Sequence, residues 1–145
     1  MKKENIAFCV FIFTMVCGCV KKDPHFTMGE NQVGALSFDS KVTELEALFA
    51  NDSVVRDTLS TPLGNSKGKI SIYEKGGKPL LQLTPNTDSI PTIEMVQVLD
   101  NRFTSDKGIS LKSSFKDILR AYPNCKVVTT VNSVVVFPKG SNLYF

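Results

Sequence analysis

An internal repeat is the feature that most constrains the fold of this chain. Residues 36–51 align without a gap with residues 109–124. Apolar residues of the two segments coincide at Leu36/Ile109, Phe38/Leu111, Val42/Phe115, Leu45/Ile118 and Phe49/Tyr122. Polar residues coincide at Ser40/Ser113, Glu44/Asp117 and Asn51/Asn124, and a glycine, Gly34 or Gly108, precedes each segment. Because the apolar spacing and the polar positions agree together, we interpret the segments as copies of one structural unit.

Each unit is predicted to contain a short strand followed by an amphipathic helix. The strands are expected at residues 35–38 and 109–111, and a serine can cap each helix, namely Ser40 in the first unit and Ser113 or Ser114 in the second. Apolar side chains recur along both helices at three- and four-residue steps, which places them on one face. The buried faces are expected to comprise Val42, Leu45, Leu48 and Phe49 in the first helix and Phe115, Ile118, Leu119 and Tyr122 in the second.

Strands are expected after each helix. In the first unit they are predicted at residues 54–55, 69–74, 79–83 and 93–99, with a hairpin turn at 75–78. In the second unit they are predicted at residues 126–131, 133–137 and 142–145. The predicted fold class is therefore α+β, with two tandem repeats that each pack a short helix on antiparallel strands. The second repeat lacks a last strand, either because it is naturally shorter or because the chain is truncated.

The N-terminal residues resemble the signal of a bacterial lipoprotein. Two lysines precede an apolar run from Ile6 to Val16, which at about 11 residues is well short of the roughly 20 needed to cross a bilayer. The run ends in Val16-Cys17-Gly18-Cys19, which resembles a lipobox. The resemblance implies cleavage between Gly18 and Cys19 and a diacylglyceryl group on Cys19. The alternative is an ordinary secretory signal that happens to contain cysteine.

This signal implies a division of the chain and a location. We expect a signal peptide at 1–18, a lipidated flexible tether at 19–32, repeat 1 at 33–100 and repeat 2 at 101–145. The lipid would attach the protein to a membrane. In enterobacterial lipoproteins, an aspartate directly after the lipidated cysteine signals retention in the inner membrane. This chain has Val20 at that position. By that resemblance we expect a lipid-anchored protein of the bacterial cell envelope, at the outer membrane, on its periplasmic or surface face.

Composition argues against several classes of function. The net charge is only +3 and no basic cluster is interleaved with aromatic residues, so we expect no nucleic-acid binding. If Cys9 and Cys17 leave with the signal and Cys19 is lipidated, Cys125 is the remaining thiol, and we expect it to be buried without a disulfide. The single histidine, His25, falls in the expected tether. We therefore expect no catalytic Cys-His or Ser-His pair, no metal site and no cofactor.

Three Asp-Ser/Thr-apolar triplets are candidates for modification. They resemble the O-glycosylation motif of exported proteins in some Gram-negative anaerobes, and the resemblance implies sugars on Ser53, Thr58 and Ser89. All three residues lie in expected loops or at strand edges, where a glycan can be accommodated. Coincidence is the alternative, because the motif is very short.

Other prominent residues have simpler explanations. Glu44 and Glu46 are two apart on a helix and point to different sides, so we interpret them as solvated charges and not as an acid-base pair. The lysines of the first hairpin are expected to protect strand edges from aggregation, more than to bind an anionic partner; they are Lys67, Lys69, Lys75 and Lys78. Phe103 is expected to fill the joint between the units, with an exposed anchor for a partner as the alternative.

The repeated pattern Gly-apolar-x-apolar-x-Ser-x-x-apolar-x-x-apolar resembles small envelope domains of the SmpA/OmlA and β-lactamase-inhibitor-like superfamily. Residues 100–109 are similar to the linker before a second copy in lipoproteins of Gram-negative anaerobes, although Pro123 stands where a glycine usually follows the second helix. The resemblance implies protein binding or envelope assembly and brings no catalytic residues. We therefore expect a non-catalytic, lipid-anchored module that binds another envelope protein. The alternatives are a small-ligand-binding or hydrolase-like domain and a truncated relic of a longer two-repeat lipoprotein.

Overall fold

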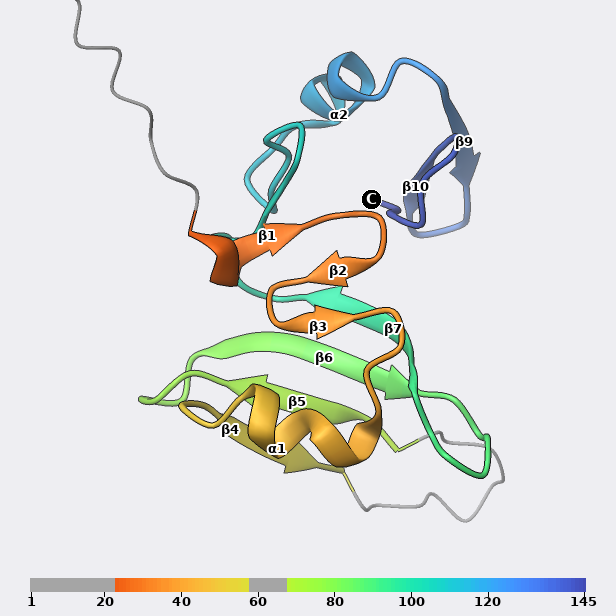
Figure 1. The fold of residues 1–145 in the computed structure, drawn as a ribbon. Helices are drawn as coiled ribbons and strands as arrows, with labels where there is room; N and C mark the ends of the chain where they lie inside the picture. Colours follow the sequence, from red (N-terminus) through yellow and green to blue (C-terminus); the bar gives the residue numbers. More distant parts are fainter. Residues whose placement is uncertain (1–22, 58–67) are drawn as a thin grey trace, which may run out of the picture.

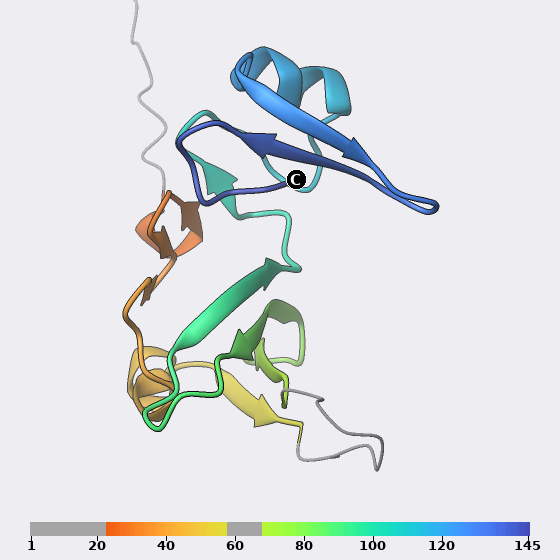
Figure 2. The same cartoon turned by 90° about the vertical axis from the view of Figure 1, so that its right-hand side faces the viewer.

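The computed structural model describes residues 23–57 and 68–145 (Figure 1). Within these ranges the fold is mixed α+β, with ten strands in three sheets and two short α-helices. Figures 1 and 2 show α1 with the largest sheet at one end of the molecule and α2 with the β9–β10 hairpin at the other. None of the described helices is long and apolar enough to cross a membrane.

The largest sheet belongs to the first unit. It comprises β4 (Ser53–Arg56), β5 (Ile70–Tyr73), β6 (Pro79–Pro85) and β7 (Ile93–Val98), in that order, and every pair is antiparallel. The predicted hairpin turn between β5 and β6 is confirmed, because the Glu74 N–H donates to the Lys78 carbonyl at 2.9 Å. Gly76 and Gly77 adopt φ values of +105° and +83°, which favour glycine.

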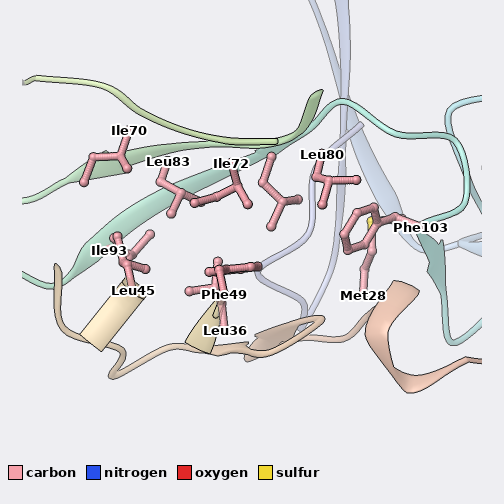
Figure 3. Packing of buried hydrophobic residues seen from close by; sticks show 11 residues of the cluster. Met28, Leu36, Leu45, Phe49, Ile70, Ile72, Leu80, Leu83, Ile93 and Phe103 are labelled. Carbon is pink, nitrogen blue, oxygen red and sulfur yellow. The ribbon is translucent and has the colours of Figure 1, made fainter. Parts of the chain in front are cut away.

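The first helix packs against this sheet through only part of its predicted face. The 3-10 turn η2 (Val42–Glu44) leads into α1 (Leu45–Leu48). Leu45 and Phe49 are buried as predicted, but Leu48 is 38% exposed, so its predicted burial is wrong. The helix has a single α-helical turn, and the narrow face that meets the sheet therefore accommodates few side chains. Figure 3 shows the resulting core, which contains Met28, Leu36, Leu45, Phe49, Ile70, Ile72, Leu80, Leu81, Leu83, Ile93 and Phe103.

The folded part of the chain begins earlier than predicted. Residues 24–33, most of them assigned from the sequence to the flexible tether, form the 3-10 turn η1 (Pro24–Phe26), β1 (Thr27–Met28) and β2 (Gln32–Val33). These strands form a small sheet with β3 (Leu36–Ser37) and β8 (Thr104–Ser105), in the order β3-β2-β1-β8. The segment is ordered because Met28 joins the core and the Phe26 ring packs edge-on against Phe103 at 5.2 Å.

Phe103 is 2% exposed and lies in the core cluster. It packs between the N-terminal segment and the first unit, at the start of the chain that leads to the second unit. Its burial contradicts the alternative of an exposed anchor. Because its neighbours in the core belong to the N-terminal segment and the first unit, the prediction that it fills the joint between the two units stays a prediction.

The second unit is smaller. It comprises α2 (Phe115–Ala121) and the hairpin of β9 (Cys125–Thr129) and β10 (Val134–Pro138). Residues 142–145 lie beside β10, where Phe145 and Val136 exchange two backbone hydrogen bonds of 2.7 and 3.0 Å. The predicted strand at 142–145 is therefore reduced to one paired residue, and residues 109–111 form no strand.

The second helix begins as predicted but is less buried than predicted. Ser114 is its N-cap, and its side chain accepts from the Asp117 N–H while the Asp117 carboxylate accepts from the Ser114 N–H at 3.0 Å. Tyr122 is buried, but Phe115 is 48% exposed, so that prediction is wrong. Cys125, predicted to be buried, is only partly buried. A two-stranded hairpin offers less surface than the four-stranded sheet of the first unit, which leaves these side chains partly uncovered.

Candidate functional site

Among the residues that the structure describes, partners for the outer edge of β7 are found only at its beginning. The Val42 N–H donates to the Pro91 carbonyl at 2.9 Å, and the Ile93 N–H donates to the Ser40 carbonyl at 3.3 Å. The segment that carries β3 therefore runs beside the start of β7 and then diverges from it. Figure 2 shows the orange segment that carries β3 and the green strand β7 close together near α1 and further apart beyond it.

A serine turn causes the divergence. The Ser40 N–H donates to the Ser37 carbonyl at 3.1 Å, and the Ser40 hydroxyl accepts from the Ser37 N–H at 3.0 Å. Side-chain bonds of this kind offer the backbone an alternative to a sheet ladder. Ser40 thus shapes this turn and is not the helix cap that the sequence predicts, since Lys41 is the N-cap of η2.

Two valines of β7 direct their backbone groups toward the open side. The Leu99 N–H donates to the Leu80 carbonyl, so Leu99 occupies a hydrogen-bonded position of the β6–β7 ladder. Antiparallel ladders alternate between hydrogen-bonded and non-hydrogen-bonded pairs, which makes Val98 and Val96 non-hydrogen-bonded positions. The N–H and C=O groups of Val96 and Val98 therefore point away from β6. In the described part of the chain, neither valine forms a backbone hydrogen bond on that side. This edge offers donors and acceptors to an incoming strand.

The open edge lies in a groove of about 660 Å³ between the two units. Its walls are formed by β7, by residues 28–33 and 36–38, by Ser110, Leu111, Ser113 and Ile118, and by residues 142–145. Four of its apolar side chains are between 40% and 67% exposed; they are Phe38, Met95, Leu111 and Tyr144. Exposed apolar side chains gathered in a concave surface are typical of a binding site.

Residues that coincide when 36–51 are aligned with 109–124 line this groove on both sides. The Ser110 N–H donates to the Ser113 hydroxyl oxygen at 3.1 Å, which is the same bond that joins Ser37 to Ser40. Phe38 and Leu111 follow the first serine of each turn, and both line the groove. The sequence predicts both side chains in strands, but the turns expose them. The signal that could have located them is the Ser-x-x-Ser spacing shared by the two units.

Two charged residues line the described part of the groove, and both are acidic, Glu30 and Glu94. Two contacts join the units beside them. The side-chain amide of Asn142 donates to Asn31 Oδ1 at 3.1 Å, and Leu143 packs against the core of the first unit. The groove is thus apolar with a negative component, and its two sides come from different units.

A separate ionic cluster fixes the chain between the units. The Asp100 carboxylate is fully buried and accepts from Arg102 at 2.8 Å and from Lys78 at 2.7 Å. Arg102 also donates to both Glu74 oxygens, at 2.9 and 3.0 Å. Hydrogen bonds from Arg102 hold the pKa of Asp100 far below its usual range and lower the pKa of Glu74. These carboxylates stay ionised, so the cluster is suited to holding structure and not to proton transfer.

Only two of the site residues predicted from the sequence, Ser53 and Ser89, lie in the part of the chain that the structure describes. Gly18, Cys19 and Thr58 lie outside the described residues, and their predicted roles stay predictions. Ser53 begins β4 and Ser89 lies in the loop between β6 and β7; both are exposed and neither lines the groove. Sugars on them stay a prediction as well.

The acidic residues of the first helix do not converge. Glu46 pairs with Arg56, which lowers the pKa of Glu46, whereas Glu44 lies 3.8 Å from Lys41. Of the hairpin lysines, Lys67 lies outside the described residues. Two others have specific partners, because Lys78 binds Asp100 and Lys69 donates to Gln82 at 3.1 Å. Within residues 23–57 and 68–145, no three His, Cys, Asp or Glu side chains are grouped so as to hold a metal ion.

Comparisons of the chain with models of protein families, with curated proteins and with solved structures each gave no match. The resemblances to a lipoprotein signal and to SmpA/OmlA-like domains therefore stay predictions.

Proposed function

We propose that this protein is a non-catalytic, lipid-anchored protein of the cell envelope that binds another protein in the groove between its two units. The observation that carries the proposal is the open edge of β7, bordered by exposed apolar residues from both units. Open strand edges and exposed apolar grooves are sites of protein recognition.

We also propose that the two units are copies of one ancestral unit. Three features support this. Both units have a serine turn, at 37–40 and at 110–113, and a hairpin after the helix. In both, the backbone N–H just after the helix donates to a carbonyl four residues earlier, from Phe49 to Leu45 and from Tyr122 to Ile118. In this view the groove is a place where matching turns meet. Its lining by Phe38 and Leu111 follows from the duplication.

A small apolar ligand is the second candidate. The groove volume of about 660 Å³ falls within the roughly 300–1,000 Å³ of small-molecule sites. Such a ligand would cover Phe38 and Leu111, but it would leave the outward backbone groups of β7 without partners.

The anchor is tested by changing the proposed lipidation site. The natively expressed full-length chain should incorporate a labelled fatty acid and sediment with membranes, and Cys19→Ala should do neither. Equal labelling of the wild type and the variant would contradict lipidation at Cys19.

Binding is tested by photo-cross-linking in cells. We would place p-benzoylphenylalanine at position 38, at position 111 and, as a control, at position 131, where Val131 is fully exposed outside the groove. A partner in the groove should give the same adduct from positions 38 and 111 and none from 131. No adduct from the groove positions, or equal adducts from all three, would contradict the proposal.

A further inference from the structure

We propose that the groove binds an extended peptide segment, apolar and positively charged, that adds as a strand to the open edge of β7. This inference rests on the proposed function and names the chemistry of the partner. It is argued from the backbone of β7, from the side chains around it and from the charge of the lining.

The backbone argument concerns Val96 and Val98. Their outward N–H and C=O groups have no backbone hydrogen bond within the described residues. At Ile93, by contrast, the N–H on the same edge of β7 already donates to the Ser40 carbonyl. The part of β7 beyond Ile93 spans about five residues, or roughly 17 Å at the rise of a strand. A strand of similar length can continue the pairing that stops at Ile93.

The side-chain argument concerns the apolar residues on both sides of this edge. Phe38 and Met95 line the groove from the first unit, and Leu111 and Tyr144 line it from the second. In an added strand, alternate side chains point to opposite faces, so one set can meet these residues while the other faces solvent. The complementary segment therefore alternates apolar and polar residues.

The charge argument concerns the lining as a whole. Its charged side chains are the carboxylates of Glu30 and Glu94, and no lysine or arginine of residues 23–57 and 68–145 lines the groove. A basic segment is therefore favoured electrostatically and an acidic one is disfavoured. A lipid or another small amphiphile with a cationic head satisfies the charge but not the backbone of β7. We therefore commit to a polypeptide occupant.

The test uses the full chain in detergent and two synthetic hexapeptide probes. The basic probe has the sequence Lys-Val-Lys-Val-Lys-Val, and the acidic probe has glutamate in place of each lysine. A third probe is the basic peptide with N-methyl groups on alternate residues, which removes the donors that a strand must offer. Titration calorimetry should detect binding of the basic probe and much weaker binding of the acidic and N-methylated probes.

Two matched proline variants locate the edge. Val96→Pro removes an outward N–H from β7, and Val54→Pro removes one from β4, at the opposite edge of the same sheet. Both valines are partly buried against the core, and proline is tolerated at sheet edges where the N–H faces outward. Val96→Pro should weaken binding of the basic probe about tenfold, and Val54→Pro should leave it unchanged.

The charge is tested with Glu30→Gln and with Asp52→Asn as a control outside the groove. Glu30→Gln should reduce the preference for the basic over the acidic probe, and Asp52→Asn should not. Equal binding of the basic and N-methylated probes, or equal effects of the two proline variants, would overturn strand addition. A positive cross-link from position 38 without binding of the basic probe would overturn this inference while leaving the proposed function intact.

Discussion

Removal of the Leu45 side chain tests whether the first unit carries the stability of the fold. Leu45 is completely buried, and Figure 3 shows it beside Ile93 under the sheet. Leu45→Ala removes three carbon atoms with their hydrogens from the core. The transfer free energy lost with them is about 2.4 kcal/mol. Because the sheet holds the surrounding side chains, the cavity closes only in part, and the total loss should be about 3–4 kcal/mol.

Leu48→Ala is the matched control on the same helix. Leu48 is 38% exposed, so its truncation leaves a site open to water, and we expect a loss below about 1 kcal/mol. The chain has no tryptophan, so unfolding in urea is best followed by far-UV circular dichroism. Equal losses for the two variants would refute the reasoning, because α1 would then not be packed through Leu45.

Three further predictions concern local features. Asp100→Ala should lower the free energy of unfolding by about 2 kcal/mol at pH 7. Because the pKa of Asp100 in the folded protein lies below its ordinary value of 3.8, the difference between wild type and variant should be full above pH 3.8 and shrink as the pH falls below it. Urea titrations at pH 7, 5 and 3 would measure this difference. Ser114→Ala removes a helix cap and should cost about 1 kcal/mol, with faster hydrogen exchange at the start of α2. Gly34→Ala should lower the melting temperature more than the control Gly29→Ala. Gly34 has φ +57°, and a Cβ added there would lie 2.7 Å from the His25 carbonyl oxygen, whereas a Cβ at Gly29 would have no contact closer than 3.9 Å.

Local patterns in the sequence predicted the elements that depend on neighbouring residues. The Ser114 cap and the turn at residues 75–78 rest on side chains and glycines a few positions apart. Pairings between distant residues were not predictable in this way. Met28 pairs with Ser105 through β1 and β8, and nothing near residue 28 indicates that partner. The sequence therefore predicts a tether for most of this segment, although Met28 contributes to the core.

The groove is not predictable from the sequence for a different physical reason. Apolar residues at regular spacing predict burial, and Phe38 and Leu111 have the spacing of inward-facing strand residues. A competing local interaction prevails, since the serine hydroxyls of the two turns bond to the backbone and end the strand geometry. Exposure of an apolar residue thus depends here on a polar residue two positions away.

The unequal size of the two units explains why a groove exists between them. The first unit and the N-terminal segment together form the continuous core, whereas Ile109, Tyr122 and Val136 are buried outside that cluster. The second unit is joined to the first through the linker at Phe103 and through the contacts of Asn142 and Leu143 beside the groove. A segment bound along β7 would contact both units at once. Its binding would therefore also fix the second unit against the first, which couples recognition to the rigidity of the whole protein.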